Sequence, residues 1–396
     1  FAKLSENFEE RESQINLAKF IAESFNKNLV GIFEAGTGVG KSFAYLIPSI
    51  IWAVKNKERV IISTGTINLQ QQLVEKDIPL AEKISGKKIK AVLMKGRQNY
   101  ICKRRLNDAA TDRELFNDDV EQFESIIEWS KTTSTGSRSD LSFLPQESVW
   151  SRVNSEADMC MGMRCVYHDS CYVMQLRKEA ASANLIVVNH HLLFADLEAR
   201  LEGVGYDDTA VLPPFNRIIF DEAHGMENAA TSFFSAQLNR FKILKQINLL
   251  YRVRRGSVAG HLITLEALSS RKDKAESVMV VFESLNSHLA EMEDEALLLM
   301  SEEFTWRLCD KTAKDASALL TLMNTIHEDI AKFVGAFRSI ITGIAEKDEE
   351  HPAVWETKHI LNRLENAGNV CQWFTEWSER NDTIFWIDKV RYNGKS

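Results

Sequence analysis

Strands that alternate with helices predict an α/β fold built on a parallel sheet. Short apolar runs of strand length recur along the chain, a glycine-rich turn follows the first of them, and stretches of helical periodicity separate the others. This alternation is typical of parallel sheets that helices cover on both faces. The expected strands are Leu29–Phe33, Val60–Thr64, Ala91–Met94, Leu185–Val188 and Arg217–Phe220.

Helices are expected before and between these strands. The first covers most of 1–28, where apolar residues follow an irregular helical stripe. The second begins near Gly40, and Pro48 should bend it or end its first part. A third passes through Leu69 and Leu73.

Two long segments interrupt the alternation. The first holds four cysteines and a polar stretch, 132–142, that is typical of a loop. The second lacks proline between Pro214 and Pro352 and shows helical stripes, so we expect it to be all-helical. A strand-like tail, Thr383–Ile387, is expected to return to the sheet. The resulting divisions are an α/β part at 1–96, a cysteine-bearing insertion at 97–171, more of the α/β part at 172–225, a helical insertion at 226–380 and the returning tail at 381–396.

Length, net charge and the distribution of apolar residues limit the classes to which this protein can belong. The 396 residues are enough for two or three packed cores. The formal charge of −8 does not suggest a generally basic nucleic-acid binder, although a narrow groove needs only local positive charge. No apolar run approaches the roughly 18 residues of a membrane span, and no signal peptide follows Phe1. We therefore expect a cytoplasmic protein whose start has been trimmed, with no membrane partner.

The glycine-rich turn fits a phosphate-binding loop. Small residues let backbone N–H groups surround phosphate oxygens, Lys41 can reach the β- and γ-phosphates, and Ser42 can offer a hydroxyl to Mg²⁺. An ordinary turn is the alternative, and the strand, loop and helix order disfavours it. The residues of the loop are Ala35, Gly36, Thr37, Gly38, Val39, Gly40, Lys41 and Ser42.

An acidic pair follows the last strand of the sheet. Asp221 can hold Mg²⁺, and Glu222 can orient or deprotonate an attacking water. A strand can end in two carboxylates by chance, so the pair alone is a moderate signal. Together with a phosphate-binding loop it predicts an ATP- and Mg²⁺-dependent hydrolase.

Four of the six cysteines are grouped as one distant and three close thiols. Cys102 precedes Cys160, Cys165 and Cys171, and the close three have the spacing C-x4-C-x5-C. Four thiolates can hold a four-iron, four-sulfur cluster or a structural zinc ion. The paired C-x2-C knuckles usual for zinc are absent, which modestly favours the cluster.

Asp221-Glu222-Ala223-His224 is the motif of superfamily 2 helicases, and the whole pattern resembles the DinG/XPD family of iron–sulfur DNA helicases, nearest to bacterial DinG. The segments 63–73, 95–102 and 183–197 resemble further family motifs, so the resemblance covers 1–225 densely. The helical part resembles the family's "arch" only in position and character.

The resemblance implies a RecA-like motor domain interrupted by an iron–sulfur domain and an arch. It implies an ATP-dependent 5′→3′ DNA helicase of the bacterial cytoplasm, involved in DNA repair and monomeric, that acts on single-stranded and forked or branched duplex DNA. The resemblance favours a [4Fe-4S] cluster over zinc on the four cysteines. It also implies that Arg11 and Gln14 contact the adenine of ATP and that His224 is one of the catalytic residues.

Candidate DNA contacts also come from the resemblance. They are Thr64, Thr66, Gln70, Arg97 and Tyr100. Such a motor grips mainly the strand's backbone, and aromatic rings can stack on bases. The basic run 103–105 is either a further contact or a solvated face.

No segment resembles the family's motif III or the arginine motif of a second motor domain, so we expect these residues to be half of the motor and to hydrolyse ATP poorly alone. Two rival hypotheses stay open: a DNA- or partner-binding module without turnover, and a P-loop ATPase with no role in nucleic-acid metabolism.

Overall fold

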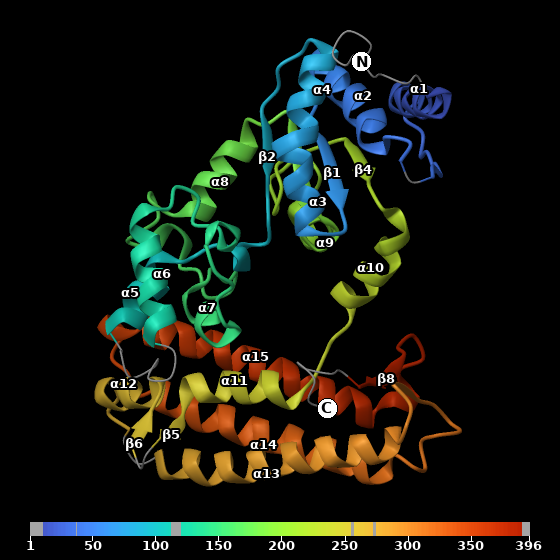
Figure 1. Ribbon diagram of the computed structural model, residues 1–396. Helices are drawn as coiled ribbons and strands as arrows, with labels where there is room; N and C mark the ends of the chain where they lie inside the picture. Colours follow the sequence, from blue (N-terminus) through green and yellow to red (C-terminus); the bar gives the residue numbers. More distant parts are fainter. Residues whose placement is uncertain (1–10, 37, 112–119, 255–256, 272–274, 390–396) are drawn as a thin grey trace. The chain divides into compact units, whose positions relative to one another are not determined.

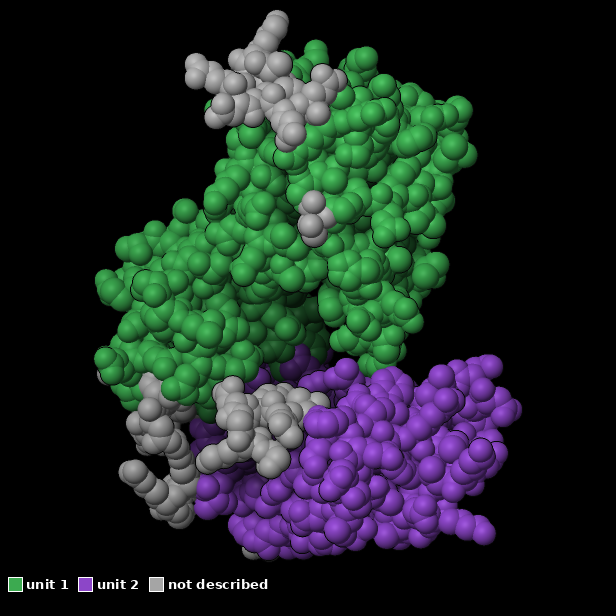
Figure 2. All heavy atoms as spheres, turned by 45° about the vertical axis from the view of Figure 1, so that its right-hand side comes forward, with its two compact units in different colours: residues 1–235 green, residues 236–396 purple. Residues whose placement is uncertain are grey.

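The chain divides into two compact units, and each is described here by itself. Unit 1 spans Phe1–Ser235 and unit 2 spans Ala236–Ser396 (Figure 2). The computed structural model describes residues 11–36, 38–111, 120–254, 257–271 and 275–389. Thr37 of the phosphate-binding loop and the first ten residues of the expected N-terminal helix lie outside the described residues.

A four-stranded parallel sheet forms the centre of unit 1. Its spatial order is β2-β3-β1-β4, so β1 lies between β3 and β4. Val60 of β1 stands opposite Leu185 on one side and Arg217 on the other. The four strands are β1 (Val60–Thr64), β2 (Ala91–Leu93), β3 (Leu185–Asn189) and β4 (Arg217–Phe220). Four of the five predicted strands and their parallel pairing are therefore confirmed.

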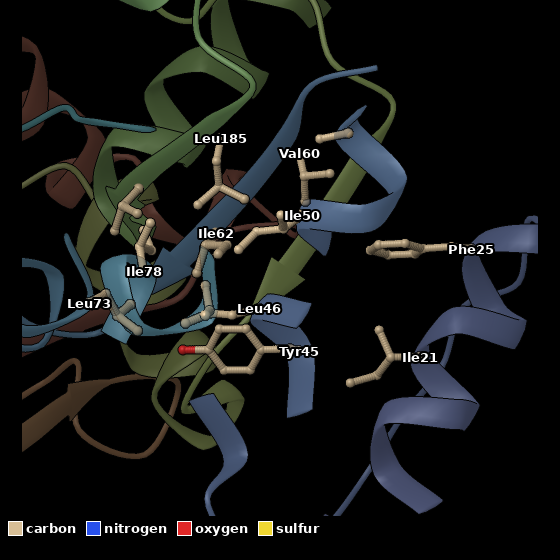
Figure 3. Packing of buried hydrophobic residues seen from close by; sticks show 13 residues of the cluster. Ile21, Phe25, Tyr45, Leu46, Ile50, Val60, Ile62, Leu73, Ile78 and Leu185 are labelled. Carbon is tan, nitrogen blue, oxygen red and sulfur yellow. The ribbon is translucent and has the colours of Figure 1, made fainter. Parts of the chain in front are cut away.

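Helices cover both faces of this sheet because its central strands are apolar on both sides. Val60 and Ile62 point into a core shared with α1, α2 and α4 (Figure 3), whereas Ile61 belongs to the core on the opposite face, beneath α8 and α9. Alternate residues of a strand face opposite sides, so a continuous apolar run supplies both cores. The covering helices are α1 (Glu12–Lys27), α2 (Lys41–Asn56), α4 (Ile78–Ser85), α8 (Tyr172–Ala181) and α9 (His190–Ala199).

The expected strand Leu29–Phe33 does not form. It pairs with no described strand, and Val30 and Ile32 are each 94% exposed. A strand is stabilised by a hydrogen-bonded neighbour, and among the described residues 29–33 does not pair with the outer edge of β4 or with any other strand. Apolar composition alone therefore gave a wrong prediction here.

The structure narrows one helix prediction and corrects another. Pro48 does not end α2, because the helix runs on to Asn56, and a bend at Pro48 stays a prediction. The helix expected through Leu69 and Leu73 is divided into α3 (Ile67–Gln72), a π-helical turn η1 (Leu73–Asp77) and α4. Thr66 caps α3, with its hydroxyl accepting from the Leu69 N–H at 3.3 Å.

The cysteine-bearing insertion is a small helical body with its own core (Figure 1). Trp150 is 1% exposed at its centre, and its indole N–H donates to the Gln98 carbonyl at 2.8 Å. The polar stretch 132–142 is a loop with one 3-10 turn, as predicted, except that Thr132 is the last residue of α6. The elements are η2 (Arg97–Asn99), α5 (Lys103–Thr111), α6 (Val120–Thr132), η4 (Arg138–Asp140), α7 (Glu147–Val153) and η5 (Gly162–Arg164).

Unit 1 ends with short helical segments on either side of β4. The first, η6, leads into the loop that precedes the strand, and the others follow the acidic pair. They are η6 (Arg200–Val204), η7 (Ala223–Gly225) and α10 (Met226–Phe234).

Unit 2 is mainly helical, but it is not the all-helical domain that the sequence predicted. Three long helices, α13, α14 and α15, lie side by side with α11 and α12 against them (Figure 1). Two small antiparallel sheets join them, because short runs such as Thr305–Leu308 alternate exposed and buried residues in the manner of strands. The elements are α11 (Arg240–Leu250), β5 (Arg252–Arg254), β6 (Ser257–Ala259), α12 (His261–Leu268), α13 (Ala275–Met300), β7 (Thr305–Leu308), α14 (Ser317–Ile341), η8 (Glu346–Asp348), α15 (Pro352–Thr375), η9 (Trp377–Glu379) and β8 (Phe385–Asp388).

The strand-like tail forms, but with a different partner. β8 pairs antiparallel with β7 of unit 2, Trp306 standing opposite Ile387, rather than returning to the parallel sheet. Phe385 is buried there with Trp306 and Leu308, so local apolar packing determines the pairing. Among the described residues, no helix combines the length and the apolarity that crossing a bilayer requires.

Candidate functional site

The phosphate-binding loop turns the chain into the N-terminus of α2. Gly38 and Gly40 have φ values of 78° and 84°, in the left-handed region that glycine adopts most readily. Gly40 is the N-cap of α2, so Lys41 is the first residue of the helix. The unpaired N–H groups and the positive end of α2 therefore face the site where a phosphate would bind.

Residues at the start of α1 hold this loop. Arg11 donates from its guanidinium to the Gly38 carbonyl, and Gln14 donates from Nε2 to the Gly40 carbonyl at 2.9 Å. Both side chains thus lie at the loop, as their predicted role requires. Their contact with an adenine stays a prediction.

The acidic pair at the end of β4 lies beside the start of α2. The Asp221 N–H donates to the Ser63 carbonyl at 2.8 Å and so continues the sheet pairing. Lys41 Nζ lies 3.5 Å from Glu222 Oε1, and the Tyr45 hydroxyl donates to Asp221 Oδ2 at 3.2 Å. The structure therefore brings together two motifs that are 181 positions apart in the sequence.

Burial is the main influence on the charge of Asp221. It raises the pKa of this carboxyl, as does the neighbouring Glu222, while the Tyr45 hydrogen bond and Lys41 act in the opposite direction. A carboxylate held in partial burial is stabilised by a cation, which makes the position suitable for Mg²⁺.

Glu222 and His224 complete the acidic motif. Glu222 has a left-handed backbone, with φ 54° and ψ 47°, which is uncommon for a residue with a side chain. His224 Nδ1 lies 3.2 Å from Glu222 Oε2, and the imidazole is largely exposed. A catalytic role for His224 stays a prediction, because the contact described for its imidazole is with Glu222 of the same motif.

The four clustered cysteines line one small cavity in the insertion. Cys102, Cys160, Cys165 and Cys171 share its wall with Arg104, Arg105 and Met159, among others. All six cysteines are free thiols. Burial raises the pKa of the Cys102 thiol, and the two arginines partly oppose that effect. Within the described ranges, no three His, Cys, Asp or Glu side chains gather closely enough to hold a metal ion.

Backbone pairing brings the distant Cys102 to the later cysteines. Ile101 forms a bridge with Asn154, and the Cys102 N–H donates to the Val153 carbonyl at 2.7 Å. The Arg105 guanidinium reinforces this join, donating to the Asn154 carbonyl at 2.8 Å and to the Ser151 carbonyl at 3.0 Å.

Burial counts against several of the expected DNA contacts, which stay predictions. Thr64 and Gln70 are fully buried and Tyr100 is 5% exposed, so these side chains offer little surface to a strand. Thr66 and Arg97 are accessible and stay predictions. In the basic run, Arg104 and Arg105 are also buried, because they hold carbonyls and carboxylates of the insertion.

The sequence analysis missed two residues at the site. Tyr45 contacts Asp221, and the buried His190 contacts Ser63 through Nδ1 at 2.7 Å. The position of Tyr45 four residues after Lys41, on the same face of α2, was a usable signal. His190 offered none, because only the pairing of β1 with β3 brings it to Ser63.

Comparison with known proteins finds that the chain is similar to part of several helicases. No protein-family profile matches it. It is 36% identical over 258 residues to the ATP-dependent DNA helicase YoaA of Haemophilus influenzae, a match covering 63% of this chain and 39% of YoaA. It is 34% identical over 250 residues to the ATP-dependent helicase DinG of Mycobacterium tuberculosis, covering 58% and 36%. This chain is a relative of the DinG and YoaA helicases.

The similarity covers only part of each relative, and the relatives have different names. The chain spans about two fifths of the curated relatives that it matches. A third relative, from Bacillus subtilis, is 28% identical over 264 residues, covering 64% of this chain and 27% of that protein, and is named 3′-5′ exonuclease DinG. The predicted resemblance to the DinG family is therefore confirmed.

Proposed function

We propose that this chain supplies the ATP and Mg²⁺ site of a DinG-like, ATP-dependent DNA helicase. The observation that carries the proposal is the junction of the two motifs, with Lys41 Nζ 3.5 Å from Glu222 Oε1. Lys41 would move to the β- and γ-phosphates when ATP binds, and Glu222 would then be free to orient the attacking water. Mg²⁺ would be held by Ser42 and Asp221.

Finer features of the function follow the family. The proposed movement is 5′→3′ along single-stranded DNA, with opening of forked or branched duplexes. The arginines that neutralise charge on the γ-phosphate are proposed to come from a second motor domain, for which these 396 residues carry no motif. Thr66 and Arg97 are the accessible candidates for contact with the strand.

We also propose that the four cysteines hold a [4Fe-4S] cluster. The support is the chemistry of the donors, since four free thiols line one cavity beside two arginines that would offset thiolate charge. A zinc ion needs thiolates about 3.8 Å apart for bonds of about 2.3 Å, whereas a four-iron cluster is larger and its thiolates stand further apart. The cluster would join Cys102 to 160–171.

A second candidate function is a DNA- or partner-binding module without ATP turnover. It stays open because these 396 residues carry no motif of the second motor domain that turnover would need. A P-loop ATPase with no nucleic-acid role is the remaining rival.

One assay separates these functions. ATP hydrolysis is measured with and without single-stranded DNA in the protein joined to the second motor domain of a DinG helicase, and in the Lys41→Ala and Glu222→Gln variants of that fusion. The helicase proposal expects nucleotide binding that Lys41→Ala removes, and stimulation by DNA that Glu222→Gln abolishes without loss of binding. Tight DNA binding without any turnover supports the binding module, and turnover that DNA leaves unchanged supports the plain ATPase.

A further inference from the structure

Tyr45 lies one helical turn after Lys41 on α2, and each of these two residues contacts one member of the acidic pair. Lys41 lies at Glu222, and the Tyr45 hydroxyl donates to Asp221 Oδ2 at 3.2 Å. The Tyr45 ring is 4% exposed and packs in the core beneath the sheet, with Leu46 and Ile50 of the same helix (Figure 3). The phenol is therefore fixed by packing as well as by its hydrogen bond.

The same phenol lies close to the other residue proposed for Mg²⁺. Ser42 precedes Tyr45 by three positions on α2, so the two side chains share one face of the helix. Tyr45 thus stands between Ser42 and Asp221, which come from the two motifs.

The phenol can donate to Asp221 because it stays protonated. A tyrosine hydroxyl has an ordinary pKa of about 10, so it remains a donor at physiological pH. A donor held against Oδ2 limits the rotation of the Asp221 carboxylate and leaves Oδ1 for a cation. Outer groups that orient metal ligands in this manner contribute substantially to metal affinity.

We propose that Tyr45 is a positioning residue for the Mg²⁺ site, orienting Asp221 and Ser42 together so that the ion binds with its nucleotide. The inference rests on the proposed function, because it presumes that Ser42 and Asp221 hold the metal. The competing explanation is that Asp221 merely satisfies a buried phenol. In that case Tyr45 would affect stability and not metal affinity.

The test is a Mg²⁺ titration of nucleotide binding. A fluorescent ATP analogue is bound to the protein in EDTA and then in rising MgCl₂, for the natural sequence and for Tyr45→Phe. Tyr172→Phe is the matched control, because Tyr172 is also buried in unit 1 and its hydroxyl makes one hydrogen bond, to the Thr133 carbonyl at 3.3 Å. Thermal unfolding is recorded for all three proteins.

Tyr45→Phe is expected to raise the Mg²⁺ concentration for half-maximal effect about three- to ten-fold, the change that the loss of one hydrogen bond produces. Binding in EDTA should be unchanged, and Tyr172→Phe should leave both quantities unchanged. Tyr45→Met, which removes the hydroxyl with a more adaptable side chain, should reproduce the shift and replaces the first variant if that one does not fold.

Two results overturn the inference. One is an unchanged Mg²⁺ midpoint in Tyr45→Phe, and the other is an equal loss of binding with and without Mg²⁺, which would mark a structural role. A natural protein that binds the analogue without any response to Mg²⁺ contradicts the proposed function instead, so the two failures are distinguishable.

Discussion

Arg200 and Asp196 form a buried ion pair that organises the loop before β4. Arg200 Nε donates to Asp196 Oδ2 at 2.7 Å, and the two side chains are 1% and 0% exposed. The guanidinium also donates to the Gly205 carbonyl and the Leu212 carbonyl, each at 3.0 Å. Asp196 in turn accepts from the Leu212 N–H at 2.6 Å. The pair therefore fixes the chain that leads from α9 into the strand carrying the acidic motif.

Replacing Arg200 by methionine should strongly destabilise unit 1. The change leaves a buried carboxylate and several carbonyls without partners, and breaking a buried pair in this way costs about 3–5 kcal/mol. Urea unfolding measures the loss. Arg338→Met is the matched control, since the Arg338–Glu365 pair is largely exposed and should cost under about 1 kcal/mol. Equal losses in the two variants would contradict the assigned role of Arg200.

His190 predicts a dependence of stability on pH. It is 2% exposed, its Nδ1 contacts Ser63 Oγ at 2.7 Å, and burial lowers its pKa. A histidine buried in its neutral form takes up a proton more readily when the chain unfolds. Its contribution to stability is therefore present above the unfolded pKa of about 6.5 and is lost as pH falls below that value.

Replacing His190 by glutamine should weaken this dependence. The slope of unfolding free energy against pH, measured by urea unfolding at a series of pH values below about 6.5, should fall by up to about 1.4 kcal/mol per pH unit. His224→Gln is the control, because the His224 side chain is 81% exposed. A similar change of slope in both variants would show that burial of His190 is not the cause.

The parallel sheet was predictable from continuous apolar runs in the sequence. The pairing of the other predicted strands was not predictable, because it depends on residues distant in the sequence. Val60–Thr64 and Leu185–Asn189 are central strands with apolar residues on both faces, so their burial and their parallel pairing follow from composition. Leu29–Phe33 is equally apolar, yet it forms no strand, because pairing depends on a neighbour that local sequence does not specify. Phe385–Asp388 pairs with β7 of unit 2 and not with the parallel sheet, and its local sequence did not specify this neighbour either.

The candidate site was predictable where its chemistry is local. The loop around Lys41 and the pair Asp221-Glu222 each carry their residue types in a short motif, and they meet in the structure. Arg105 was misjudged because charge in a sequence suggests a surface, whereas this guanidinium is buried against backbone carbonyls. Tyr45 was overlooked because a tyrosine within an apolar helix is typical of a core residue. Its ring is in the core, and only its hydroxyl reaches the site.

The four cysteines of the insertion give a spectroscopic prediction. If they hold a [4Fe-4S] cluster, the isolated protein has a broad absorbance shoulder near roughly 400 nm. Cys165→Ser should abolish it, because Cys165 is one of the four thiols lining the cavity. Cys309→Ser, at a free thiol of unit 2, should leave it intact. A colourless protein that contains zinc would disprove the cluster.

The backbone of Glu222 predicts that stability and activity can be separated at one position. Its left-handed conformation costs a residue with a side chain about 1–2 kcal/mol, a cost that glycine does not bear. The contact with Lys41 contributes little to stability, because both side chains are about one third exposed.

Glu222→Gly should therefore be at least as stable as Glu222→Gln in urea unfolding, although glycine also makes the unfolded chain more flexible. Both variants should lose about 100-fold or more in DNA-stimulated ATP hydrolysis, since both lack the carboxylate. Ser301→Gly tests the backbone argument alone: Ser301 has φ 47° and no proposed role, so glycine should be tolerated there without loss of stability or activity. A Glu222→Gly protein markedly less stable than Glu222→Gln, beside an undisturbed Ser301→Gly, would mean that the Glu222 side chain stabilises the fold more than its strained backbone destabilises it.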